Sequence, residues 1–297
     1  MNELYLIYHA PRTGGTYLST SLPYWHNRRN ENWLMSYNID ERYQEVFNDI
    51  PSILKRTKTQ QEQLKFVVGH SLTRAFPLLL KSAQEIKNIF PCRHPVERLL
   101  SSFNFRHACA KLCQDNSVFN YISPCAHASA THGEKTFYDY DTLYEWYKDN
   151  KGEQNLQTRW LIKSFYQTDN GKLWEIEKFN RNFVPYYEGT FYIPEFLDSQ
   201  NLTDYLSEVA LQTIEEKIWW CPILNTLSAD TKDFLAQVLD DTGVSTRNIL
   251  RNSSTEKVEP YWTLEDVYNQ HDIQYLIDSE KWDFRVWDAA KNKTRPF

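Results

Sequence analysis

A group of residues that could bind an anion lies near the start of the chain. It combines an arginine, two hydroxyl side chains, two adjacent glycines and an aromatic residue: Arg12, Thr13, Gly14, Gly15, Thr16 and Tyr17. Glycines let the backbone approach a phosphate, guanidinium and hydroxyl groups donate hydrogen bonds, and a helix N-terminus attracts negative charge. Because the chain has only eight glycines, two adjacent ones beside these donors favour an anion-binding loop over an ordinary turn.

A second group with suitable chemistry is Arg93 and Ser101, in the stretch CRHPVERLLSSF. Arg93 follows an expected strand over 88–92, and Pro95 occupies a favoured first position for a helix. Ser101 lies about two helical turns further on, so its hydroxyl can return toward the end of the strand. A guanidinium and a hydroxyl that converge can bind a phosphate. Arg98 is expected to brace the helix through a salt bridge.

His70 is the first candidate for a general base, because it follows an expected strand over 66–68 and imidazole titrates near neutral pH. A structural histidine is the alternative interpretation of His70. His9 and Glu97 are the competing candidates for the base.

The elements that would position these residues alternate between short apolar strands and helices. Strands are expected at 4–8, 66–68 and 88–92, and 23–38 is interpreted as a surface loop. Helices are expected at 17–22, 73–86, 95–108, 139–150, 154–167, 172–182, 203–219, 229–241, 263–270 and 272–279. This order predicts an α/β fold, a central parallel sheet flanked by helices, with a P-loop-like nucleotide-binding core and a helical elaboration in one domain over 1–297. A GxxxxGK[ST] loop is absent from the sequence.

The stretch HAPRTGGTYL resembles the 5′-phosphosulfate loop of carbohydrate sulfotransferases, the Golgi-type enzymes and their bacterial relatives. The usual family form is Pro-Lys-Thr-Gly-Gly-Thr, so Arg12 replaces the expected lysine. RHPVERLLS is similar to the family's 3′-phosphate motif, Arg-x-Pro-x-x-Arg-x-x-Ser, at every fixed position. The resemblance implies that the co-substrate is 3′-phosphoadenosine 5′-phosphosulfate and that the acceptor is a hydroxyl of a saccharide or glycoconjugate.

The resemblance also suggests roles for individual residues. His70 would be the general base and Arg12 would stabilise the leaving group, while Arg251 and Ser253 match a late loop that closes over the nucleotide. The stretch NLQTRWL resembles a family Asn-x-x-Thr-Arg segment, in which Arg159 either faces a substrate or forms a structural salt bridge. Family members need no metal for their chemistry, so no metal site is predicted.

Composition limits the other classes of function. The net charge of −6 gives no indication of nucleic-acid binding. No apolar run approaches the roughly 20 residues that span a bilayer, and a strand that begins almost at Met1 favours a cytoplasmic, bacterial enzyme. Five cysteines do not suggest a disulfide scaffold. The segment 107–132 carries cysteines and histidines, and it is interpreted as an acceptor-side loop, with a structural zinc site as the alternative. Oligomeric state is not indicated.

Two rival functions follow from the same residues. One is a nucleotide-dependent kinase with an unusual loop, which would need a magnesium-binding Asp after a strand. The other is a non-catalytic glycan-binding protein on the same fold.

Overall fold

A four-stranded parallel sheet forms the centre of the protein. The computed structural model describes residues 3–15, 17–18, 32–36, 57–62, 64–69, 72, 76–81, 84–114, 131–132, 135–136, 140–169, 172–175, 202–238, 262–268 and 272–297. The strands are β1 (Glu3–Tyr8), β2 (Asn32–Ser36), β3 (Leu64–Gly69) and β4 (Glu85–Ile89), in the spatial order β2-β3-β1-β4. All three strand pairs are parallel. The predicted α/β fold with a parallel sheet is confirmed at this level.

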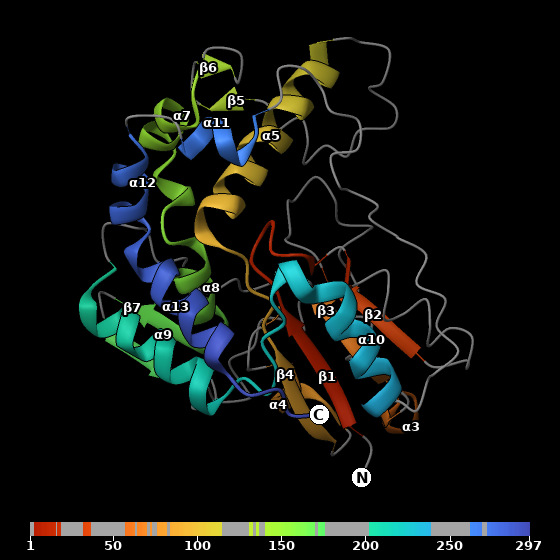
Figure 1. The fold of residues 1–297 in the computed structure, drawn as a ribbon. Coiled ribbons are helices and arrows are strands. Elements are labelled where there is room, and N and C mark those ends of the chain that lie inside the picture. Colours follow the sequence, from red (N-terminus) through yellow and green to blue (C-terminus); the bar gives the residue numbers. More distant parts are fainter. Residues whose placement is uncertain are drawn as a thin grey trace.

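Helices cover both faces of the sheet (Figure 1). Because side chains alternate along a strand, Leu4 and Leu6 of β1 enter one core cluster, while Tyr5 and Ile7 enter another. The first cluster packs against α8 (Leu156–Phe165), α9 (Asp204–Glu216) and α13 (Lys281–Asn292). The second packs against α10 (Leu227–Val238), whose Phe234 makes ring contacts with Tyr5. The sheet is therefore the middle layer of three.

The order of the strands places a topological switch point at the carboxyl end of β1. The chain that leaves β1 leads to β2, which lies on the β3 side. On the opposite edge, β4 is flanked by residues 220–223, through parallel bridges from Ile89 to Trp220 and from Cys92 to Ile223. Parallel sheets bind ligands where the connections that leave two neighbouring strands run in opposite directions along the sheet. β1 and β4 are such a pair of neighbouring strands.

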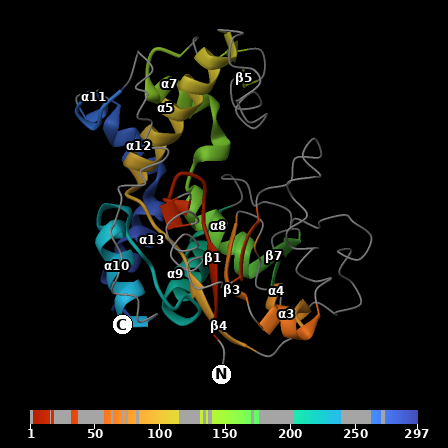
Figure 2. The same cartoon turned by 90° about the vertical axis from the view of Figure 1, so that its right-hand side faces the viewer.

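A further group of helices lies beyond the carboxyl ends of the strands (Figures 1 and 2). It comprises α5 (Pro95–Gln114), α7 (Leu143–Asp149), α11 (Leu264–Tyr268) and α12 (Ile273–Ser279). Phe103, Trp146, Val267 and Leu276 belong to its apolar core. α5 begins just beyond β4 and reaches from the sheet into this group, so its first turns lie near the carboxyl ends of the strands.

The remaining regular elements are short. They are α3 (Lys58–Glu62), α4 (Phe76–Leu79), β5 (Thr131–His132), β6 (Lys135–Thr136), β7 (Tyr166–Asp169), β8 (Lys172–Glu175) and the 3₁₀ turns Lys151–Glu153 and Leu224–Thr226. Among the residues that the structure describes, no helix is long and apolar enough to cross a membrane.

Four sequence predictions about these elements are wrong. The helix predicted at 172–182 begins instead as β8, paired antiparallel with β7, and the loop predicted at 23–38 contains β2. Within the described part of 73–86, the helix is limited to the single turn of α4, and β4 starts three residues before its predicted beginning at Asn88. α13, at the end of the chain, was not predicted.

Candidate functional site

The loop after β1 has an unusual backbone. Arg12 and Gly14 have φ angles of 69° and 93°, and for a non-glycine residue such a conformation costs on the order of 1–3 kcal/mol. The buried Thr13 hydroxyl donates to the Ala10 carbonyl at 2.7 Å. The Leu18 N–H donates to the Gly14 carbonyl at 3.1 Å, which closes the first helical turn. The loop therefore reverses direction tightly and turns the Thr13 hydroxyl hydrogen toward its own backbone.

Gly15 is required by its contact with His9. A Cβ atom on Gly15 would lie 2.0 Å from His9 Nδ1, and the His9 side chain is buried. The ring of His9 therefore packs directly against the loop at Gly15. Tyr17 is partly buried against the core cluster that includes α10.

Arg12 reaches from the loop to α5. Its Nε donates to Ser101 Oγ at 3.1 Å. Its guanidinium carbon lies 4.4 Å from the ring centroid of Phe105, which is one helical turn beyond Ser101. The side chain is thus held by a hydrogen bond and by the face of an aromatic ring.

Arg93, which follows β4, contacts the Arg12 loop. Its Nη1 donates to the Arg12 carbonyl at 3.3 Å, and its Nε lies 3.7 Å from the Glu97 carboxylate. The backbone of Arg93 is held on both sides by the side chain of Gln157, with two hydrogen bonds of 2.9 Å. Pro95 is the first residue of α5, as predicted. The two predicted anion-binding groups are therefore in direct contact.

We define the anion cluster as Arg12, Arg93 and Ser101. Its two guanidinium groups and one hydroxyl lie close together beyond the carboxyl ends of β1 and β4, which is chemistry suited to a phosphate. Glu97 is the acidic neighbour of the cluster, close enough to pair with Arg93. The other predicted site residues, Thr16, His70, Arg251 and Ser253, lie outside the described residues, although the described β3 ends one position before His70.

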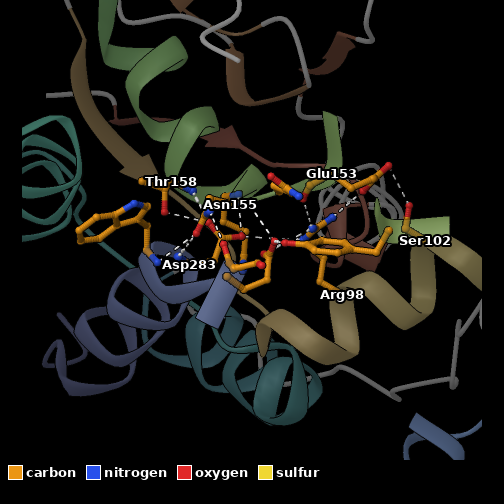
Figure 3. Close-up of polar contacts among 12 residues, drawn as sticks. Arg98, Ser102, Glu153, Asn155, Thr158 and Asp283 are labelled. Carbon is orange, nitrogen blue, oxygen red and sulfur yellow. Dashed lines mark hydrogen bonds and ion pairs between the residues drawn. The ribbon is translucent and has the colours of Figure 1, made fainter. Parts of the chain in front are cut away.

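α5 also carries Arg98, the centre of a buried polar network (Figure 3). Arg98 is fully buried and donates to Glu153, to the carboxylate at 2.9 Å and to the main-chain carbonyl at 2.6 Å. Its guanidinium also lies 3.8 Å from Glu280 and 3.9 Å from Asp283. Arg106 also pairs with Glu153. The predicted salt bridge of Arg98 is confirmed, and it joins α5 to two distant parts of the chain, the turn at Glu153 and the start of α13.

The N-termini of α8 and α13 cap each other within this network (Figure 3). Asp283 accepts from the N–H groups of Gln157 and Thr158, at 3.0 and 2.8 Å, and from the Thr158 hydroxyl at 2.8 Å. In return, Asn155 Oδ1 accepts from the N–H groups of Trp282 and Asp283, at 3.0 and 3.2 Å. Each helix thereby satisfies N–H groups that it cannot pair internally. We call this arrangement the helix junction.

Burial changes the ionisation of the acidic groups around Arg98. Desolvation, followed by the charge of Asp283, raises the pKa of Glu280 to about 8. Glu280 also accepts hydrogen bonds from the Tyr147 hydroxyl at 2.6 Å and the Asn155 N–H at 2.9 Å. The pKa of Glu153 is lowered: burial opposes this shift, but the nearby charges of Arg106 and Arg98 outweigh it. Glu280 is therefore the carboxyl of this network that retains its proton to near-neutral pH.

Arg159 has a structural role. Its Nε donates to the Gln154 carbonyl at 2.8 Å, its guanidinium also donates to the Gly152 carbonyl, and only 1% of the residue is exposed. Of the two interpretations of Arg159, the structural one fits, and these two hydrogen bonds go to main-chain carbonyls.

A hollow of about 450 Å³ lies elsewhere, beside β4 and the chain terminus. Its lining includes Lys87, Lys217 and Lys293. Lys87 pairs with Glu85, and Lys293 donates to the Glu215 carbonyl at 3.0 Å. These interactions engage the ammonium groups of Lys87 and Lys293. The anion cluster is therefore a stronger candidate than the hollow for binding an anion. Within the described ranges, no group of three or more His, Cys, Asp or Glu side chains could hold a metal ion.

Sequence reasoning missed Gln157, Phe105 and Asp283. Gln157 lies inside the stretch NLQTRWL, where the arginine drew attention and the glutamine did not. A scan against models of known protein families finds no match, and no curated protein is significantly similar to the chain.

Proposed function

We propose that the protein is a sulfotransferase that moves a sulfuryl group from 3′-phosphoadenosine 5′-phosphosulfate to a hydroxyl of a saccharide or glycoconjugate. The observation that carries this proposal is the convergence of Arg12, Arg93 and Ser101 at the carboxyl ends of β1 and β4. Loops at this edge of a parallel sheet are where nucleotides bind. The cluster supplies charge-assisted donors for a phosphate group of the co-substrate.

In the proposed reaction, the acceptor oxygen attacks sulfur while the bond between sulfur and the 5′-phosphate oxygen breaks. The acceptor proton passes to His70, and the leaving oxygen carries the negative charge that develops. Fixed donors of the β1 loop would stabilise that charge. In-line geometry is expected by analogy with phosphoryl transfer.

Arg12 suits a somewhat different role from the one that the family pattern implies. Its guanidinium contacts Ser101 and Phe105 of α5, so it supports binding of the phosphate beside α5 as well as stabilisation of the leaving group. Two guanidinium groups around one phosphate favour a dianionic phosphomonoester, the form of a 3′-phosphate near neutral pH.

Calorimetric titration with 3′-phosphoadenosine 5′-phosphate, with ATP as the control ligand, tests the proposal. The bisphosphate should bind and ATP should bind more weakly. Arg93→Ala removes charge-assisted hydrogen bonds of about 1.5–3 kcal/mol, so its Kd should rise about 10- to 100-fold. Arg285→Ala, which removes an exposed arginine paired with Glu208, is the matched control and should leave the Kd unchanged.

Turnover separates the rivals. His70→Ala should retain binding and lose sulfuryl transfer to a saccharide, whereas a glycan-binding protein would transfer nothing in the wild type. Tighter binding of ATP than of the bisphosphate would favour the kinase instead. Near-normal turnover by His70→Ala would assign the base to another residue.

A further inference from the structure

A single side chain fixes the backbone of Arg93. The Gln157 amide oxygen accepts from the Arg93 N–H, and the Gln157 amide nitrogen donates to the Arg93 carbonyl, both at 2.9 Å. Gln157 is fully buried. The two bonds engage both the N–H and the carbonyl of one residue, as the paired hydrogen bonds between neighbouring antiparallel strands do. They hold the backbone at the position where β4 has ended and α5 has not begun.

Gln157 is itself held by the helix junction. Its own N–H donates to Asp283 at 3.0 Å, in the first turn of α8. Asp283 is in turn aligned by Asn155, which accepts its N–H at 3.2 Å, and its charge is balanced by Arg98 at 3.9 Å. A continuous chain of buried contacts therefore runs from α13 through α8 to Arg93.

We infer that Gln157 is a positioning residue, through which the junction of α8 and α13 places the Arg93 guanidinium for binding of the 3′-phosphate. The inference rests on the proposed function, because it concerns the affinity of the same site. The side chain of Gln157 bonds to the main chain of Arg93, and it acts on the ligand through that arginine.

Charge near the cluster explains why this placement matters. The Arg93 guanidinium lies between the Arg12 carbonyl, at 3.3 Å, and the Glu97 carboxylate, at 3.7 Å. Hydrogen bonds weaken steeply as their geometry departs from linear. A backbone released from Gln157 lets the guanidinium move onto Glu97, where the carboxylate competes with a ligand phosphate.

A double-mutant cycle tests the inference, with Kd for 3′-phosphoadenosine 5′-phosphate as the readout. Gln157→Met keeps the volume of the side chain and removes both bonds to Arg93. Its Kd should rise at least about tenfold. In the Arg93→Ala background the same change should alter the Kd less than about twofold, because no guanidinium remains to be misplaced.

Gln61→Met is the matched control. Gln61 lies on α3, away from the anion cluster, and is as buried as Gln157. Its side chain accepts a hydrogen bond from the Lys81 N–H at 2.6 Å. Both variants should lower the unfolding midpoint, but only the Gln157 variant should weaken binding. Should Gln157→Met fail to fold, Gln157→Glu, which keeps the acceptor for the Arg93 N–H, should show a smaller loss of affinity with the same dependence on Arg93.

The outcomes are distinct. Equal losses of affinity with and without Arg93, or unchanged affinity in a folded Gln157 variant, overturn the positioning role and leave the proposed function standing. Absence of bisphosphate binding by the wild type overturns the proposed function, and the inference with it.

Discussion

Replacing Glu280 with glutamine should remove a pH dependence from the stability of the protein. Glu280 is fully buried, and the groups that face it are Asp283 and Arg98, with hydrogen bonds from Tyr147 and Asn155. Desolvation and then Asp283 raise its pKa from the ordinary 4.5 to about 8. Glutamine has nearly the same shape, can accept the same two hydrogen bonds, and does not titrate.

The sign follows from where the proton is bound. Between pH 4.5 and about 8 the folded state keeps the Glu280 proton, while the unfolded state has lost it. Stability must therefore fall as pH rises across this window, and the full cost is present above it. At about 1.4 kcal/mol per pH unit, the cost reaches on the order of 5 kcal/mol. Below pH 4.5 both states are protonated and the cost vanishes.

Urea unfolding at a series of pH values from 5 to 8.5 measures the effect. The free energy of unfolding of Glu280→Gln, minus that of the wild type, should increase with pH across the series. Glu208→Gln, at an exposed carboxylate paired with Arg285, is the control for losing a surface charge and should give a flat difference. A constant offset for Glu280→Gln would show that the carboxyl is already ionised in the folded state and refute the reasoning.

Two further substitutions test the packing of the loop and the network. Gly15→Ala places a methyl group against the His9 ring and should cost about 1–3 kcal/mol of unfolding free energy. In the control, Gly152→Ala, the new methyl group meets no atom within 4 Å, so the unfolding free energy should change by less than about 0.5 kcal/mol. Equal effects of the two variants in urea titrations would contradict the contact between Gly15 and His9. Arg98→Met leaves buried carboxylates without their cation and should cost about 3–5 kcal/mol, and a loss below about 1 kcal/mol would show that the network does not depend on that charge.

The parts of the fold that were predicted correctly are those with local signals. The apolar run of β1 ends at a glycine loop, and the proline at the start of α5 marks its first turn. Local sequence was sufficient for these elements. The direct hydrogen bond between Arg12 and Ser101 was not predicted.

The errors have a different physical origin. Residues 172–175, Lys-Leu-Trp-Glu, are too few to show a period of two, and the helical pattern assumed over 172–182 left β8 unpredicted. β4 is only partly buried and contains Lys87, which pairs with Glu85, so hydrophobicity alone placed the strand too late. The partners of Gln157 and Arg98 come from residues far away in sequence, and no local pattern encodes such pairings.

The reciprocal capping of α8 and α13 has a consequence for biosynthesis. Asn155 and Asp283 are separated by 128 positions, and contacts of such long separation form late and slow folding. A chain emerging from the ribosome can build β1 to β4 before α13 has been translated. The start of α8, and with it the support of Arg93, is therefore completed only after Asp283, 128 positions beyond Asn155, has been made.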